Sequence, residues 1–129
     1  MYIRTVNVYV NDVDRAIAFY TGSLGWEKRT DAPMNDEIRW VTVGPPGEKT
    51  QFVLCKGFAG WAPEKVGGFT GTVIGVDDVE AAAAGLSERG VEFTTPPTPQ
   101  PWGLWAQFVD SEGNEFGLHS EPSTLAAVF

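Results

Sequence analysis

The sequence predicts an α+β fold in which a βαβββ unit occurs twice in tandem. Residues 10–14 (VNDVD) and 76–80 (VDDVE) share one pattern and lie 66 positions apart (76 − 10). Gly47 and Gly113, each in a turn-like stretch, have the same separation (113 − 47), and a fixed period of this kind indicates an internal repeat. A chain of 129 residues is long enough for one domain with its own core.

We therefore expect a single domain with two repeats. The expected parts are a first repeat at about 1–57, a loop at 58–68, a second repeat at about 69–120 and a C-terminal tail at 121–129.

The first repeat begins with alternating polar and apolar residues at 4–10, which is typical of a half-buried strand. Asp12 can then cap a helix that ends at Gly25. Its apolar face has the i, i+3, i+4, i+7 spacing of Val13, Ala16, Ile17 and Tyr20. Three strands follow at roughly 26–31, 37–43 and 50–56, and the stretch GPPG at 44–47 predicts a turn between the last two.

The second repeat follows the same order. Residues 70–76 predict a strand, Asp78 caps a helix, and Gly90 ends it. The apolar face of this helix consists of Val79, Ala82, Ala83 and Leu86. Three strands are expected at 91–94, 104–109 and 115–120, with a turn at 110–114. The proline-rich residues 94–103 are expected to form a stiff wall or rim of a pocket.

Composition excludes several classes of partner. The formal net charge is −8 and the few Lys and Arg residues are scattered, which argues against nucleic acid and anionic membranes and favours a neutral or cationic ligand. Cys55 is the only cysteine, so an intrachain disulfide is impossible and a reducing compartment is expected. The first residues lack the pattern of a signal peptide, and no apolar run could span a bilayer. We expect a cytoplasmic protein.

Six segments together carry a family resemblance. They are VYVNDVDRAIAFY at 8–20, LGW at 24–26, VDDVE at 76–80, GVEF at 90–93, QPWG at 100–103 and FVDSEGN at 108–114. In this order and spacing the chain resembles the glyoxalase/bleomycin-resistance/extradiol-dioxygenase proteins of the vicinal-oxygen-chelate superfamily. The resemblance implies open mixed sheets that curl around a cavity, helices outside, and a homodimer.

The resemblance also implies four positions for a divalent metal, which fall here on Thr5, Gln51, Gly71 and Gly117. The family pattern has His, Glu or Gln at these places. Gly71 and Gly117 have no side-chain donor, while Thr5 and Gln51 offer only neutral oxygens. We expect no metal and no other cofactor.

Strand alternation extends the set of residues that face the cavity. Pairing across the 110–114 turn places Trp105 opposite His119 and Gln107 opposite Gly117, and the repeat offset matches Arg39 with Trp105 (105 − 39 = 66). The predicted ligand-binding residues are Tyr9, Asn7, Arg39, Gln51, Trp102, Trp105, Gln107 and His119. Cys55 shares this face, and we expect a buried, inert thiol there.

The leading functional hypothesis is a metal-free protein that binds a planar antibiotic or metabolite. The QPWG stretch at 100–103 is shared with drug-sequestering, antibiotic-resistance members of the resembled family. The alternative is an enzyme, either a lyase, isomerase or dioxygenase with a non-standard metal site or one whose cofactorless chemistry uses His119, the only histidine. A third is a structural or regulatory module without a ligand. The sequence leaves open whether one chain or a swapped dimer closes the cavity.

Overall fold

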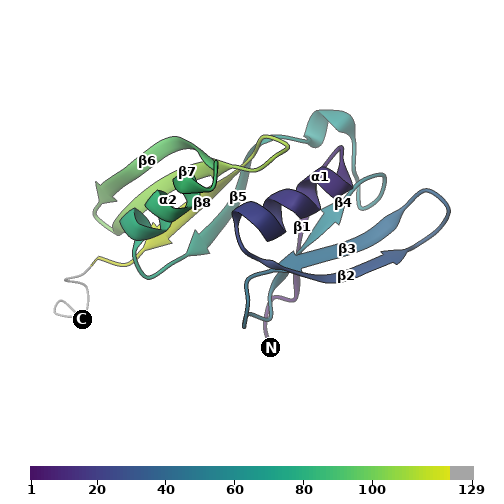
Figure 1. Ribbon diagram of the computed structural model, residues 1–129, viewed down its shortest axis with the longest axis horizontal. Coiled ribbons are helices and arrows are strands. Elements are labelled where there is room, and N and C mark those ends of the chain that lie inside the picture. The colour runs from purple at the N-terminus through teal and green to yellow at the C-terminus, as the bar shows by residue number, and fades with distance from the viewer. Residues whose placement is uncertain (123–129) are drawn as a thin grey trace. The chain divides into compact units, whose positions relative to one another are not determined.

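The computed structural model describes residues 1–122, which form two compact units (Figure 1). The first unit contains Met1–Gly68 together with Asp110–Asn114, and the second contains Phe69–Val109 and the described residues from Glu115 onward. Each unit has one four-stranded sheet with a helix packed on it. The predicted tandem βαβββ arrangement is confirmed.

The first sheet has the strand order β1-β4-β3-β2, with β1 parallel to β4 and the other pairs antiparallel. Its elements are β1 (Thr5–Tyr9), α1 (Val13–Ala18), the π-helical η1 (Phe19–Ser23), β2 (Glu27–Pro33), β3 (Arg39–Gly44), β4 (Gln51–Cys55) and the 3-10 turn η2 (Pro63–Lys65). The second sheet has the equivalent order β5-β8-β7-β6. Its elements are β5 (Gly68–Gly75), α2 (Val79–Glu88), β6 (Glu92–Gln100), β7 (Gly103–Val109) and β8 (Asn114–Ser120).

Both helices begin where the sequence predicts. The Asp12 side chain accepts a hydrogen bond from the Arg15 backbone N–H, and Asp78 accepts one from Ala81. Each bond satisfies one backbone donor in the first helical turn, which has no partner within the helix. The caps therefore fix the point at which the chain leaves the first strand of each repeat.

Aromatic side chains fill the space between each helix and its sheet. In the first unit, Tyr20, Trp26 and Phe52 contact one another in tilted and edge-to-face arrangements, with ring centroids 5.0 to 5.9 Å apart. In the second unit, the rings of Phe108 and Phe116 lie 5.7 Å apart. Such pairs add to the free energy gained by burying apolar area. The opposite face of each sheet is not covered by the helix of its unit.

The strand predicted at 91–94 is longer in the structure. β6 runs from Glu92 to Gln100 and so includes residues 94–100 of the proline-rich segment. β6 is the edge strand of its sheet and its register against β7 shifts twice. An edge strand can use prolines because half of its N–H groups need no partner in the sheet. Within residues 1–122, no helix is long and apolar enough to cross a membrane.

Candidate functional site

The parallel pair β1–β4 arranges the predicted residues of the first unit. Thr5 lies beside Gln51, Asn7 beside Val53 and Tyr9 beside Cys55, so these residues share the sheet face opposite α1. Gln51 is buried, and the Tyr9 hydroxyl donates a hydrogen bond to the Ala59 carbonyl. Thr5 and Gln51 are therefore neighbours in the sheet.

Arg39 does not lie on this face. β3 pairs Thr42 with Val53, whereas the repeat offset had required Arg39 at that place, and a shift by three residues turns the strand over. The Arg39 guanidinium instead donates to Asp14 of α1 at 2.8 Å and to Asp31 at 2.9 and 3.2 Å. The strand face predicted for Arg39 is therefore wrong, and Trp40 and Thr42 occupy the open face.

The turn lengths explain this error. Between their innermost paired residues, Val43 and Phe52, β3 and β4 have eight intervening residues (44–51), whereas β7 and β8 have five (110–114), a difference of three. The offset measured from Gly47 to Gly113 therefore does not extend back into the preceding strands.

In the second unit the predicted register is confirmed. Trp105 pairs with His119 and Gln107 with Gly117. The alternate residues Leu104, Ala106 and Phe108 belong to the face covered by α2. We call the opposite side of this sheet the Trp105 face, and it carries Val73, Trp105, Gln107, Glu115, Gly117 and His119.

The Trp105 ring lies directly against the backbone of Gly117. A Cβ atom at Gly117 would lie 2.3 Å from Cη2 of Trp105 and 2.8 Å from its Cζ2, far closer than atoms pack. Gly117 is therefore the residue that lets the indole lie against β8. This contact gives the face a broad, half-buried aromatic surface.

Hydrogen bonds hold Trp105 in this orientation. Its Nε1–H donates to Oε1 of Gln107 at 3.0 Å, and the Gln107 amide in turn donates to Oε1 of Glu115. The hydroxyl of Thr94 donates to the same carboxylate oxygen at 2.9 Å. Because a carboxylate only accepts and an indole N–H only donates, this chain fixes the orientation of the Gln107 amide.

His119 holds the segment that precedes β7. Its Nε2 lies 2.8 Å from the carbonyl oxygen of Trp102, and since a carbonyl only accepts, Nε2 carries the hydrogen. Among residues 1–122, no carboxylate hydrogen-bonds to His119, so this imidazole lacks the orienting acid typical of a general base. The Trp102 side chain itself is 56% exposed.

A family model for the Glyoxalase/Bleomycin resistance protein/Dioxygenase superfamily matches residues 2–118. The chain belongs to this superfamily. The protein YetH of Bacillus subtilis (strain 168) is 33% identical over 116 residues, covering 90% of this chain and 95% of YetH.

Two solved structures from the superfamily are also similar. A member from Sphaerobacter thermophilus DSM 20745 is 38% identical with a TM-score of 0.82, covering 94% of this chain and 98% of that one. TnmS3, an antibiotic binding protein from Streptomyces sp. CB03234, is 34% identical with a TM-score of 0.81, covering 94% and 96%.

The residues at the superfamily's metal positions do not fit a metal. Gly71 and Gly117 bring no donor, and the space beside Gly117 is filled by the Trp105 ring. Thr5 and Gln51 are neighbours, but two neutral oxygens do not compensate for the dehydration of a divalent cation. Within residues 1–122, no three His, Cys, Asp or Glu side chains are grouped as metal ligands.

Isothermal titration calorimetry tests this conclusion. We expect Zn²⁺, Ni²⁺, Mn²⁺ and Fe²⁺ to bind the native protein no better than they bind a Thr5→Ala/Gln51→Ala variant, because neither side chain has a partner donor of sufficient strength. Micromolar binding that the double substitution abolishes would show that the metal site exists and that its ligands were misjudged.

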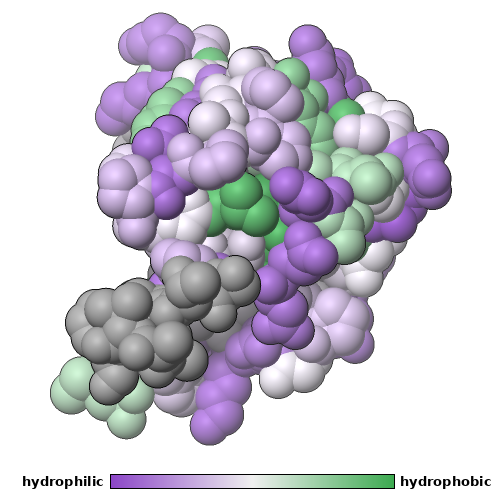
Figure 2. Space-filling view, turned by 90° about the vertical axis from the view of Figure 1, so that its left-hand side faces the viewer, coloured by the Kyte–Doolittle hydropathy of each residue, from purple (hydrophilic) through white to green (hydrophobic). Residues whose placement is uncertain are grey.

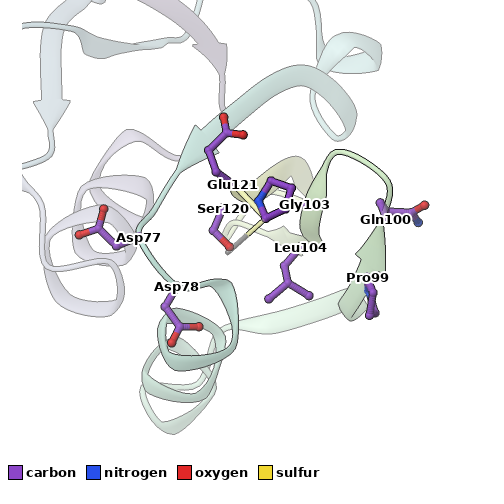
Figure 3. A pocket seen from close by; sticks show the side chains of 9 residues that line it. Asp77, Asp78, Pro99, Gln100, Gly103, Leu104, Ser120 and Glu121 are labelled. Carbon is purple, nitrogen blue, oxygen red and sulfur yellow. The ribbon is translucent and has the colours of Figure 1, made fainter. Parts of the chain in front are cut away.

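A separate depression of about 520 Å³ lies on the α2 side of the second unit. The side of the molecule drawn in Figure 2 shows a small hydrophobic area in a hollow framed by hydrophilic surface. In the depression, Leu104 lies between Asp78 and Pro99 (Figure 3). The charged residues that line the depression are all acidic. None of its lining residues is aromatic, so the depression offers no surface for stacking. Asp78 is also already engaged as the cap of α2. We therefore base the site on the Trp105 face.

Glu115 is a site residue that the ligand-binding prediction omitted. Alternation from Gly117 places it on the same face, but its importance depends on hydrogen bonds to Gln107 and Thr94 that only the fold reveals. Asn7, Tyr9 and Gln51 belong to the first unit, whereas Trp102, Trp105, Gln107 and His119 belong to the second. That they line one cavity stays a prediction.

Burial raises the pKa of Cys55 to about 11. Its thiol is buried and free, in agreement with the expected inert cysteine.

Proposed function

We propose that this protein binds a planar aromatic small molecule on the Trp105 face and does so without a metal. The observation that carries the proposal is the packing of the Trp105 ring against Gly117, which puts an aromatic surface where the superfamily's fourth metal ligand would stand. A flat indole held by its own N–H is a preorganised stacking surface. Val73, 48% exposed, adds apolar area on the same face.

The likeness to TnmS3 supports an antibiotic or a similar metabolite as the ligand. Sequestration would then protect the cell by lowering the free concentration of the compound, and this activity needs no catalytic residue. The proposal includes a cytoplasmic location and a homodimer. The acidic charge and the lack of a basic patch argue against nucleic acid or membrane partners.

Tryptophan fluorescence tests this function. Acridine, a planar and uncharged probe in mildly alkaline buffer, should quench the emission saturably, with one site per chain by calorimetry. Trp105→Ala should weaken binding by about 0.5–1.5 kcal/mol or more, the range for a lost aromatic pair.

Trp61→Phe provides the matched control, because Trp61 lies in a loop of the first unit and its indole N–H donates to Val10. That variant should keep the native affinity. Linear, non-saturating quenching, or equal affinity in Trp105→Ala and the native protein, would contradict the proposal.

A further inference from the structure

We infer that Glu115 makes the Trp105 face selective for planar ligands that carry a positive charge. This inference rests on the proposed function and names the class of ligand for the same site.

Only one of the two oxygens of the Glu115 carboxylate accepts hydrogen bonds from the described residues. Both of its hydrogen bonds, from Gln107 and from Thr94, end on Oε1. No residue in the described part of the chain donates to Oε2. Neutral donors on one oxygen position the carboxylate but leave its charge unbalanced, and a partly desolvated charge gains most from an opposite charge.

The second unit has almost no cation with which to balance it. Among its described residues are seven carboxylates (Asp77, Asp78, Glu80, Glu88, Glu92, Glu115 and Glu121) and one basic side chain, Arg89. The first unit is far more even, with ten acidic and eight basic residues. Arg89 lies at the C-terminal cap of α2, on the other side of the sheet. The chain's negative charge is therefore concentrated on the unit that carries the aromatic surface.

A second carboxylate strengthens the charge on this face. Glu92 of β6 pairs with Val109, which in turn pairs with Glu115, so both carboxylates lie at the same end of the Trp105 face. No Lys or Arg among the described residues of this unit belongs to β5, β6, β7 or β8.

The remaining polar atoms also favour a donor or a cation. The Trp105 N–H is already used by Gln107, so its ring offers only its π face, which attracts cations. In a neutral imidazole whose Nε2 donates to Trp102, the other ring nitrogen of His119 is an acceptor. Oε2 of Glu115 is an acceptor as well. A flat cation would stack on the indole and be paired by the carboxylate, whereas an anion would be repelled.

Two probes of the same shape separate charge from stacking. Acridine is uncharged in mildly alkaline buffer, whereas 10-methylacridinium carries a permanent positive charge and has no N–H group. We expect the native protein to bind 10-methylacridinium about tenfold more tightly than acridine, and Glu115→Gln to remove most of that preference. The readout is the ratio of the two affinities in each variant, because acridine reports any change in stacking that the substitution itself causes.

Glu88→Gln is the matched control, since it removes the same charge from α2 of the same unit without touching the Trp105 face. This variant should keep the preference for the cation. If acridine and 10-methylacridinium bind the native protein equally, or if Glu88→Gln and Glu115→Gln reduce the preference alike, the inference is wrong although the proposed function stands. If neither probe binds, the proposed function itself fails.

Discussion

Replacing Asp110 with alanine should destabilise the protein by about 3–5 kcal/mol, because it would leave several buried donors without a partner. Asp110 is buried in the first unit, and its carboxylate accepts four hydrogen bonds. The Tyr20 hydroxyl donates at 2.7 Å and the Asn114 side chain at 3.0 Å. The backbone N–H groups of Glu112 and Asn114 donate at 2.8 and 3.0 Å. Alanine would remove every acceptor at once.

The cluster matters because its members join distant parts of the chain. Asn114 also donates to the Tyr9 carbonyl and accepts from the Gly67 N–H, both at 2.8 Å. Glu112 accepts from the backbone N–H groups of Asn11 and Asp12, just before α1. The turn between β7 and β8 is thereby built into the first unit, which explains why the pattern FVDSEGN is informative beyond a simple turn.

Urea unfolding measures this effect as a lower midpoint with an unchanged slope. Asp36→Ala is a suitable control, because Asp36 is exposed, and its free energy of unfolding should stay within about 0.5 kcal/mol of native. An Asp110→Ala midpoint close to that of Asp36→Ala would show that the buried carboxylate contributes little.

The hydrogen-bonded cluster around Asp110 should also make the protein less stable at alkaline pH. Burial, followed by the negative charge of Asp110, raises the pKa of Tyr20 well above its ordinary value near 10. Because the pKa of Tyr20 is higher in the folded state, the free energy of unfolding is unaffected while the pH stays below the pKa of the unfolded tyrosine. Above that pH the unfolded tyrosine ionises first, and the free energy of unfolding falls as the pH rises. Cys55 acts in the same direction above its ordinary pKa of 9. Tyr20→Phe should therefore flatten the alkaline fall in the urea midpoint.

Local pattern was sufficient for most elements of the fold. The caps Asp12 and Asp78 and the alternation of β1, β7 and β8 can be read directly, because each depends on neighbours in the sequence. The position of Arg39 could not be read this way. It depends on how many residues the β3–β4 turn uses, and an odd change in that number exchanges the two faces of the strand.

The candidate site also contains some features that follow from local sequence pattern and others that do not. Trp105 and His119 follow from alternation and from one short turn, and both lie where predicted. The role of Glu115 depends on which oxygen accepts from Gln107 and Thr94, and the contact of Trp105 with Gly117 depends on a rotamer. Neither is encoded in a spacing, so neither could be predicted from the sequence.

Gly103→Ala should destabilise the second unit by about 3 kcal/mol or more, because a side chain there meets backbone that cannot move aside. Gly103 has φ +131°, a conformation that favours glycine, and its added Cβ would lie 2.1 Å from the Ser120 carbonyl oxygen. The same atom would lie 2.9 Å from Nε2 of His119, which holds the Trp102 carbonyl. The QPWG stretch at 100–103 thus has a structural reason: Gln100 pairs with Gly103 across a two-residue turn that begins with Pro101.

Gly75→Ala is the matched control, because Gly75 lies in β5 of the same unit, has no left-handed φ, and has no atom within 4 Å of an added Cβ. The urea midpoint of Gly103→Ala should lie below that of Gly75→Ala by several tenths of the native value. The near-ultraviolet circular dichroism of Trp should be lost only in Gly103→Ala. If Gly103→Ala does not fold at all, the direction of the prediction is still met, since Gly75→Ala must remain native. Equal midpoints for the two variants would show that the β6–β7 turn can relax around a methyl group and that the glycine of the motif is not required by the fold.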